Sequence, residues 1–342
     1  CKGSFTCPYY RCTTLMTNDM KPINLLITGG AGFIGSNLVE HFLKDERVAL
    51  VRVLDDLSNG YYENIEEFAA HPKFEFIQGD ICDYGTCLKA CEGIDKITHQ
   101  AALGSVPRSI ENPMRTNEVN VGGTVNMLYA AKEQGVDRIV LAFSSSTYGD
   151  HPGLPKVEDK IGKPLSPYAV SKAAIEQYAE VFGRTYGLDW IGFRYFNIFG
   201  AKQNPDNPYA AVIPIFCKAF IEDGEITING DGETSRDFTY VDNAVLINEL
   251  GLFTDNDDAL NQIYNCACGD QITLNQMVGM LENIAERKVT VTFGSERSGD
   301  VRHSKANISK AESLLGYNPI VRFEQGLQEV YNWYCDGSKN KA

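Results

Sequence analysis

Short apolar runs alternate with helical patterns over the first half of the chain. The runs occupy residues 23–28, 49–54, 74–78, 96–99 and 138–143, and each ends at glycine, acidic, amide or hydroxyl residues. Residues 34–43 carry apolar side chains at the three- and four-residue spacing of a helix, and further helical stretches separate the later runs. Strands that alternate with helices in this way predict an α/β fold with a parallel, doubly wound sheet, which binds ligands at the carboxyl ends of its strands.

The pattern changes after Gly200, where segments rich in proline, asparagine and glycine separate shorter helical stretches. We therefore expect a Rossmann domain over residues 21–198 and a smaller, mixed α/β substrate lobe over residues 199–342. The chain is expected to cross back to the first domain around residues 236–265. Residues 1–20 lack the apolar segment of a signal peptide and are expected to be a leader or an extension added for expression.

Composition narrows the classes of partner. A formal net charge of -14 in 342 residues argues against a nucleic-acid or anionic-membrane partner, because such surfaces need an extended basic face. No apolar run approaches the roughly 20 residues that span a bilayer, so a soluble, cytoplasmic protein is expected. The 10 cysteines lack paired spacing and accompanying histidines, which favours reduced thiols and no metal site.

A glycine motif joins the first predicted strand to the first predicted helix. It reads GGAGFIG over residues 29–35. Glycines allow a tight turn there, and the free N–H groups of the helix N-terminus favour a bound pyrophosphate. Asp55 lies 20 residues after Gly35, at the end of the second strand, where an acid can hold the adenosine ribose hydroxyls. The motif therefore predicts a dinucleotide site, and Asp55 favours NAD over its 2′-phosphorylated form.

Tyr168 and Lys172 lie four residues apart on a predicted helix and share one face. A phenol has a pKa of about 10 and is a poor base at neutral pH unless a cation stabilises its phenolate. The Lys172 ammonium and a bound nicotinamide ring supply that charge. Alone, this pair fits an amphipathic helix equally well, but together with the glycine motif and Asp55 it predicts proton transfer. Ser144, Ser145 and Ser146 follow the fifth run, where a hydroxyl can bond the reacting oxygen or simply form a solvated turn.

These residues resemble the extended short-chain dehydrogenase/reductase family, in particular its nucleotide-sugar 4-epimerases. The resemblance covers about residues 23–335 and also includes NVGGT at 120–124, Ser144 before Tyr148, and RYFN at 194–197. Segments 101–109, 144–156 and 299–304 are most similar to bacterial UDP-N-acetylglucosamine 4-epimerases of polysaccharide synthesis. The family further implies a homodimer formed by two helices of each cofactor domain.

The resemblance also implies which residues catalyse the reaction and which bind NAD and the UDP-sugar. Tyr168 would be the acid/base, Lys172 would hold the nicotinamide ribose, and Ser144 would bond the sugar C4 oxygen. The implied NAD-binding residues are Gly29, Gly32, Phe33, Ile34, Gly35, Asp55, Asn59, Gly60, Asp80, Ile81, Gln100, Ala101, Ala102, Asn120, Tyr168, Lys172 and Tyr195. The implied UDP-sugar-binding residues are Gly104, Ser105, Ser144, Ser145, Ser146, Tyr168, Asn197, Ala211, Val212, Arg236, Arg297, Asp300 and Ser304, with the arginines facing the diphosphate.

The implied reaction is 4-epimerisation through a transient 4-keto sugar. In the family a bulky aromatic at the position of Ser304 admits only the plain hexose, so this small residue favours UDP-GlcNAc and UDP-GalNAc, with Ser105 and Ser145 as acetamido partners. UDP-Glc/UDP-Gal or UDP-GlcNAc uronic acid remain alternatives. A sugar-nucleotide 4,6-dehydratase is disfavoured because Ser145 and Ser146 stand where family dehydratases resemble Asp-Glu. A non-catalytic NAD sensor is disfavoured because serine, tyrosine and lysine occur together.

Overall fold

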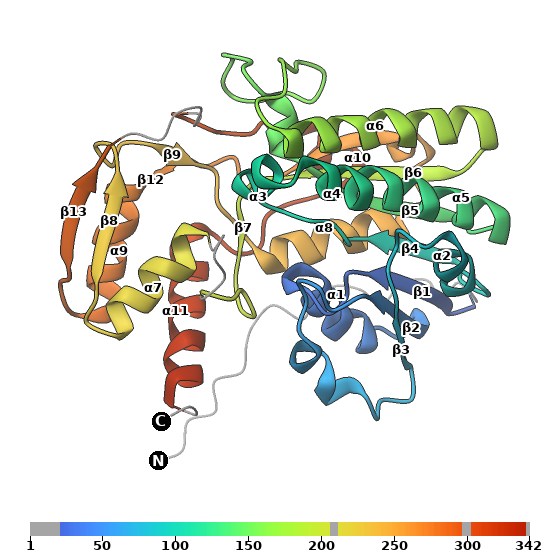
Figure 1. The fold of residues 1–342 in the computed structure, drawn as a ribbon, viewed down its shortest axis with the longest axis horizontal. Helices are drawn as coiled ribbons and strands as arrows, with labels where there is room; N and C mark the ends of the chain where they lie inside the picture. Colours follow the sequence, from blue (N-terminus) through green and yellow to red (C-terminus); the bar gives the residue numbers. More distant parts are fainter. Residues whose placement is uncertain (1–20, 206–210, 296–301, 340–342) are drawn as a thin grey trace.

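The computed structural model of the chain describes residues 21–205, 211–295 and 302–339. A seven-stranded sheet with helices on both faces lies beside a smaller lobe (Figure 1). The strand order is β11-β6-β5-β4-β1-β2-β3, and every pairing is parallel. The strands are β1 (Ile23–Thr28), β2 (Val48–Asp55), β3 (Phe74–Gln78), β4 (Lys96–His99), β5 (Arg138–Ser144), β6 (Asp189–Tyr195) and β11 (Gln262–Cys266). The predicted Rossmann-type α/β fold is confirmed.

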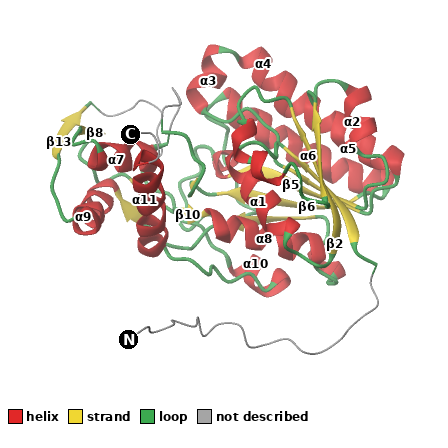
Figure 2. Ribbon diagram, turned by 90° about the horizontal axis from the view of Figure 1, so that it is seen from below, coloured by secondary structure: helices red, strands yellow, loops and turns green. Residues whose placement is uncertain are grey.

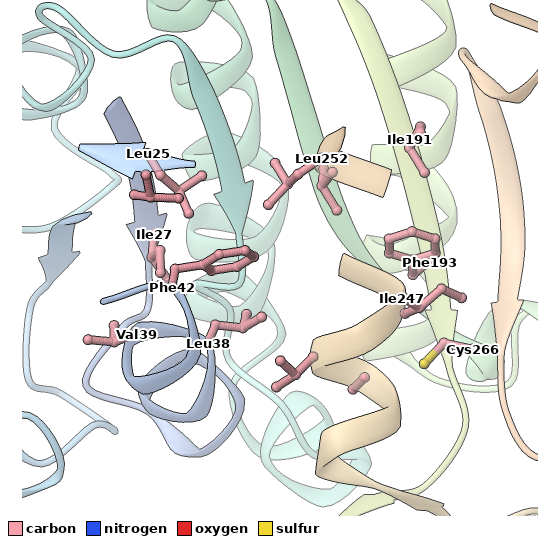
Figure 3. Packing of buried hydrophobic residues seen from close by; sticks show 14 of the residues in the cluster. Leu25, Ile27, Leu38, Val39, Phe42, Ile191, Phe193, Ile247, Leu252 and Cys266 are labelled. Carbon is pink, nitrogen blue, oxygen red and sulfur yellow. The ribbon is translucent and has the colours of Figure 1, made fainter. Parts of the chain in front are cut away.

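Helices cover both faces of this sheet and bury a separate apolar layer on each. One layer packs α1 (Phe33–Leu43), α8 (Val241–Phe253) and α10 (Ser309–Leu315) on the sheet. In it Leu25 and Ile27 of β1 lie with Phe42 of α1, and Phe193 of β6 lies with Ile247 of α8 (Figure 3). The opposite layer contains α2 (Tyr84–Ala90), α5 (Thr124–Gln134) and α6 (Pro167–Tyr186). Because both faces are covered, the strands are largely apolar rather than alternating.

Shorter helices join these elements on the large domain. They are η1 (Tyr62–Asn64), η2 (Glu66–Phe68), α3 (Val106–Glu111), α4 (Pro113–Asn117), the π-helical η3 (Glu118–Gly123), η4 (Ser145–Tyr148) and η5 (Asp257–Ala259). None of the described helices is both long and apolar enough to cross a bilayer.

Local sequence fixes the ends of α6, the helix that carries the predicted tyrosine and lysine. The Ser166 side chain accepts a hydrogen bond from the backbone N–H of Ala169 at 3.1 Å, and Pro167 occupies the first turn, where its missing N–H costs nothing. Gly187 ends the helix with a left-handed φ of 70°. These caps place Tyr168 in the first turn of α6.

The smaller lobe has its own core and mixes helices with short strands. It contains α7 (Val212–Ile221), α9 (Leu274–Ala285) and α11 (Phe323–Lys339), which stand apart from the large sheet (Figure 2). β8 (Glu225–Asn229) pairs in parallel with β13 (Thr290–Gly294), and β9 (Ser235–Arg236) pairs antiparallel with β12 (Ile272–Thr273). β7 (Ile198–Phe199) and β10 (Thr239–Tyr240) form a parallel pair where the chain passes between the two parts.

The chain passes between the two parts more than once. After β10, α8 returns to the large sheet and β11 forms its edge strand. A later segment also returns: Lys156 and Ala306 form an isolated β-bridge, and α10 packs against β11. Segments from both halves of the sequence therefore meet at the carboxyl edge of the sheet.

Candidate active site

A cavity of about 540 Å³ runs along the carboxyl ends of β1, β2, β4, β5 and β6. It passes the point where β1 lies between β2 and β4, so the order of strands reverses there. Open parallel sheets bind ligands at such a reversal. Residues 197–198, 202–204 and 211, where the chain leaves the large sheet for the smaller lobe, also line it.

The glycine turn forms the floor of one end of the cavity. Gly29 has a φ of 67°, and a Cβ there would lie 2.7 Å from the backbone nitrogen of Ala101. A Cβ at Gly35 would lie 2.0 Å from the carbonyl oxygen of Gly29. No side chain can be accommodated at either position without moving backbone, so the turn brings bare N–H groups to the start of α1.

Asp55 holds this turn in shape while it lines the cavity. Its Oδ2 accepts a hydrogen bond from the backbone N–H of Ala31 at 2.9 Å, and its Oδ1 accepts one from that of Leu57 at 2.8 Å. Burial nevertheless raises the pKa of the Asp55 carboxyl. Each oxygen keeps a second lone pair, so the carboxylate can still accept from a ligand hydroxyl.

Ser144, Tyr168 and Lys172 meet at the other end of the cavity. β5 ends at Ser144, and α6 places its first turns beside that strand end. The Lys172 ammonium donates to the carbonyl oxygen of Ala142 at 2.7 Å and lies 6.0 Å from the centre of the Tyr168 ring. The Ser144 hydroxyl lies beside the phenol and accepts a hydrogen bond from the Ser146 hydroxyl at 2.9 Å. The cluster thus joins the end of β5 to the start of α6, with Ser144 and Tyr168 separated by 24 positions in the sequence.

Burial dominates the electrostatics of this cluster. It raises the pKa of Tyr168, and the hydrogen bond with Ser144 lowers it by less. Burial lowers the pKa of Lys172 to about 8, opposed by the carboxylate of Glu176. Burial therefore dominates the pKa of Tyr168 in the protein alone, and its lowering by Lys172 together with a bound nicotinamide ring stays a prediction.

Most predicted cofactor residues line this cavity. They are Gly29, Gly32, Phe33, Ile34, Gly35, Asp55, Asn59, Gly60, Asp80, Ile81, Gln100, Ala101, Ala102, Tyr168, Lys172 and Tyr195. The predicted substrate residues that line it are Gly104, Ser105, Ser144, Ser145, Tyr168, Asn197 and Ala211. Ser146, Val212, Arg236 and Ser304 are outside its lining, and Arg297 and Asp300 fall outside the described residues.

Asn120, predicted to line the cofactor path, lies behind the cavity wall instead. It is buried in the π-helical η3, and its amide bonds both backbone groups of Leu103, at 2.8 and 3.1 Å. The same amide donates to the Ser171 hydroxyl of α6 at 3.0 Å. Asn120 therefore joins the 101–105 loop to the helix that carries Tyr168.

The structure adds polar residues that sequence reasoning did not find. Lys202 lies within 3.3 Å of a Glu40 carboxylate oxygen on α1, and Asn204 donates to the Tyr61 hydroxyl at 2.9 Å. Arg108 donates to the Asn59 side chain at 3.0 Å. Each contact joins segments at least 49 residues apart, so no local pattern marks it.

Comparison with known proteins agrees with this geometry. The model of the NAD dependent epimerase/dehydratase family matches residues 25–267. A putative UDP-glucose 4-epimerase of Methanocaldococcus jannaschii is 33% identical over 92% of this chain and 99% of its own. A UDP-glucuronate 4-epimerase of Thermodesulfobacterium geofontis is 35% identical over 90% of this chain and 95% of its own. The chain belongs to the NAD-dependent epimerase/dehydratase family.

Solved structures of the family include a UDP-N-acetylglucosamine 4-epimerase from Methanobrevibacter ruminantium M1 in complex with UDP-N-acetylmuramic acid. It is 36% identical, with a TM-score of 0.87, over 93% of this chain and 100% of its own. NAD is the cofactor of this family, and the cavity fits it. Gly29, Gly32 and Gly35 line the cavity at the N-terminus of α1, whose free N–H groups suit a pyrophosphate, and Asp55 lines it at the end of the second strand.

The glycine turn yields a direct prediction. Gly35→Ala places a methyl group against the Gly29 carbonyl and should displace the turn, so the variant should lose at least about tenfold in NAD affinity. Bound nucleotide released from the purified protein, together with titration calorimetry, measures this. Gly279→Ala on α9 is the control, because a Cβ there meets no atom within 4 Å. NAD content equal to wild type in Gly35→Ala would contradict the assignment.

Burial of the Lys172 ammonium is predicted to lower the stability of the fold at neutral pH. The pKa of Lys172 falls from 10.5 to about 8 on folding, so the unfolded chain binds this proton more tightly, and its contribution to stability increases as the pH rises from 8 to 10.5. Lys172→Met removes the buried charge but loses one hydrogen bond. The variant should be more stable than wild type at pH 7, by about 1 kcal/mol or roughly 2 °C in melting temperature, and the difference should shrink above pH 8.

Melting curves at pH 7 and pH 9.5 measure this difference, with the exposed Lys44→Met as the matched control. If Lys172→Met were less stable than wild type at pH 7, the buried lysine would not destabilise the fold and the prediction would be wrong.

Proposed function

We propose that this protein is a 4-epimerase that interconverts UDP-GlcNAc and UDP-GalNAc. The observation that carries the proposal is the cluster of Ser144, Tyr168 and Lys172 at the end of the dinucleotide cavity. Two further hydroxyls, Ser145 and Ser146, follow Ser144 in η4, where elimination of water would need an acid and a base. The cluster supports proton transfer at a single oxygen, which epimerisation requires.

Tyr168 is assigned the proton transfer at the C4 hydroxyl. Bound NAD supplies reversible acceptance of a hydride from the sugar carbon, while the protein moves the proton and orients the sugar. The Ser144 hydroxyl bonds both the phenol and the same sugar oxygen, which fixes the direction of transfer. Since burial raises the pKa of Tyr168, the phenol holds its proton at neutral pH in the protein alone, and the positive charge of the bound cofactor is needed to favour the phenolate.

Asn197 is assigned to the diphosphate. Its Nδ2 donates to the backbone carbonyl of Asp237 at 2.9 Å, and a carbonyl can only accept, so the orientation of the amide is determined. One N–H of the same nitrogen remains for a phosphate oxygen in the cavity. Arg236 lies on β9, where its guanidinium donates to the Ser235 carbonyl at 2.9 Å, and it is proposed as a further phosphate ligand with Arg297.

The choice of sugar rests on two observations. Ser304 is small, and the Methanobrevibacter relative is named a UDP-N-acetylglucosamine 4-epimerase. Other relatives are named for UDP-glucose and for UDP-glucuronate. UDP-Glc/UDP-Gal and the uronic acids are therefore the alternative substrates. A 4,6-dehydratase or a sensor without catalysis is not supported by the hydroxyl-lined turn and the complete serine, tyrosine and lysine set.

Conversion of UDP-GlcNAc tests the assignment. Purified protein without added cofactor should convert UDP-GlcNAc to UDP-GalNAc, followed by the anomeric proton signals in NMR until they stop changing. Tyr168→Phe should lower the rate by at least about a thousandfold, because it removes the only atom assigned to the proton. Tyr62→Phe, at an exposed tyrosine of η1 outside the cavity lining, is the matched control and should keep the wild-type rate.

Different products separate the alternatives. Conversion of UDP-Glc or UDP-GlcNAc uronic acid, with UDP-GlcNAc untouched, would overturn the choice of sugar and keep the epimerase. A 4-keto-6-deoxy product, or no reaction with any of these sugars, would overturn the epimerase itself.

A homodimer formed through α6 is proposed from its exposed apolar face. Val170, Tyr178, Val181 and Tyr186 of α6 are all more than 40% exposed, and Tyr129 of the neighbouring α5 is 39% exposed. Apolar side chains gathered along one helix are typical of a covered interface. A second copy of this chain, with its own α5 and α6, can complete a four-helix contact.

A charge on this face tests the dimer. Val181→Glu should convert the protein from dimer to monomer at micromolar concentration in light scattering coupled to size exclusion, because the carboxylate would be buried in the contact. Ile215→Glu, at an equally exposed apolar position on α7, should leave the mass unchanged. A wild-type protein that is already monomeric would overturn the proposed interface.

A further inference from the structure

A buried carboxylate lies where the segments carrying three predicted substrate residues converge. Asp237, between β9 and β10, is fully buried. Its Oδ1 accepts a hydrogen bond from the backbone N–H of Cys268 at 3.0 Å, and its Oδ2 accepts one from that of Ala306 at 3.1 Å. Its backbone carbonyl accepts the side-chain N–H of Asn197 at 2.9 Å. One residue therefore contacts three segments that are distant in the sequence.

Two of these segments, those of Asn197 and Ala306, hold a residue assigned to the UDP-sugar, and so does the segment of Asp237 itself. Asn197 faces the cavity, and Arg236 is the residue immediately before Asp237. Ser304 lies two residues before Ala306, and its backbone N–H donates to the Ser235 carbonyl at 3.1 Å. A shift of the Asp237 side chain would therefore move the three assigned residues relative to one another.

The Asp237 position requires two acceptor atoms. Both oxygens face backbone N–H groups, so an asparagine would direct its own N–H group at one of these donors. Among the described residues Asp237 forms no ion pair, and burial, helped by the nearby Asp270 carboxylate, raises its pKa to about 6. A carboxylate buried without a cation destabilises the fold, so stability does not explain an aspartate at this position.

We infer that Asp237 is a positioning residue for the nucleotide-sugar site. Its carboxylate holds the backbone at 268 and 306, and its carbonyl orients the Asn197 amide, so that the three assigned residues meet one ligand. This inference rests on the proposed function, which assigns those residues to the UDP-sugar. In the part of the chain that the structure describes, Asp237 forms no hydrogen bond with the glycine turn or with Asp55, so a variant at this position is expected to keep its NAD.

Asp237→Asn separates substrate positioning from a purely structural role. The variant should raise KM for UDP-GlcNAc and the Kd for UDP alone by at least about tenfold, with kcat within about threefold and NAD content equal to wild type. Asp270→Asn is the matched control: this nearby carboxylate is partly exposed, pairs with Arg322, and should leave KM and Kd unchanged. Equal UDP affinity in wild type and Asp237→Asn, or a loss of NAD content in parallel with KM, would overturn the inference.

A measurement on the wild-type protein tests the same inference if Asp237→Asn does not fold. UDP binding should slow hydrogen exchange at the backbone amides of Cys268 and Ala306, because both donate to Asp237. Unchanged exchange at both amides in the UDP-bound protein would also overturn the inference. Wild-type protein that binds no UDP would instead contradict the proposed function, so the two failures are distinguishable.

Discussion

Parallel pairing of all seven strands is the constraint on which the rest of the structure depends. It brings every carboxyl end to one edge of the sheet, so the glycine turn after β1, Asp55 on β2 and Ser144 on β5 face one cavity. The reversal of strand order beside β1 opens that edge. The lobe adds a wall because the chain leaves the sheet after β6 and returns at α8 and β11.

The candidate chemistry depends on removing water from this edge. Burial raises the pKa of Tyr168 and lowers that of Lys172 to about 8, so at neutral pH the phenol keeps its proton and the lysine is still mostly an ammonium. The Lys172 ammonium donates to the carbonyl oxygen of Ala142, which holds it beside the phenol. A ligand that brings positive charge to this site would lower the pKa values of both groups, so cofactor binding would favour the phenolate form of Tyr168.

Local patterns predicted the parts of the site that local sequence determines. The apolar runs located the first five strands to within about a residue, as for β2, predicted over 49–54 and observed over Val48–Asp55, but they did not predict β6 and β11. The glycine turn and the four-residue spacing of Tyr168 and Lys172 were predictable for the same reason. Asn120 was misplaced because its side chain direction depends on a π-helical stretch, and Asp237 was missed because its three partners come from distant segments. Lys202 and Asn204 likewise depend on how the lobe folds back over the large domain.

Retention of an isotope at the reacting carbon tests the central claim most directly. The account places one proton-transfer group and one hydride acceptor in one cavity, so the hydrogen at C4 leaves the sugar and returns to it. With UDP-GlcNAc deuterated at C4 and ordinary water, the account predicts that the UDP-GalNAc formed keeps the deuterium at C4, as judged by mass spectrometry and NMR. Product in which that deuterium has exchanged with solvent would contradict it.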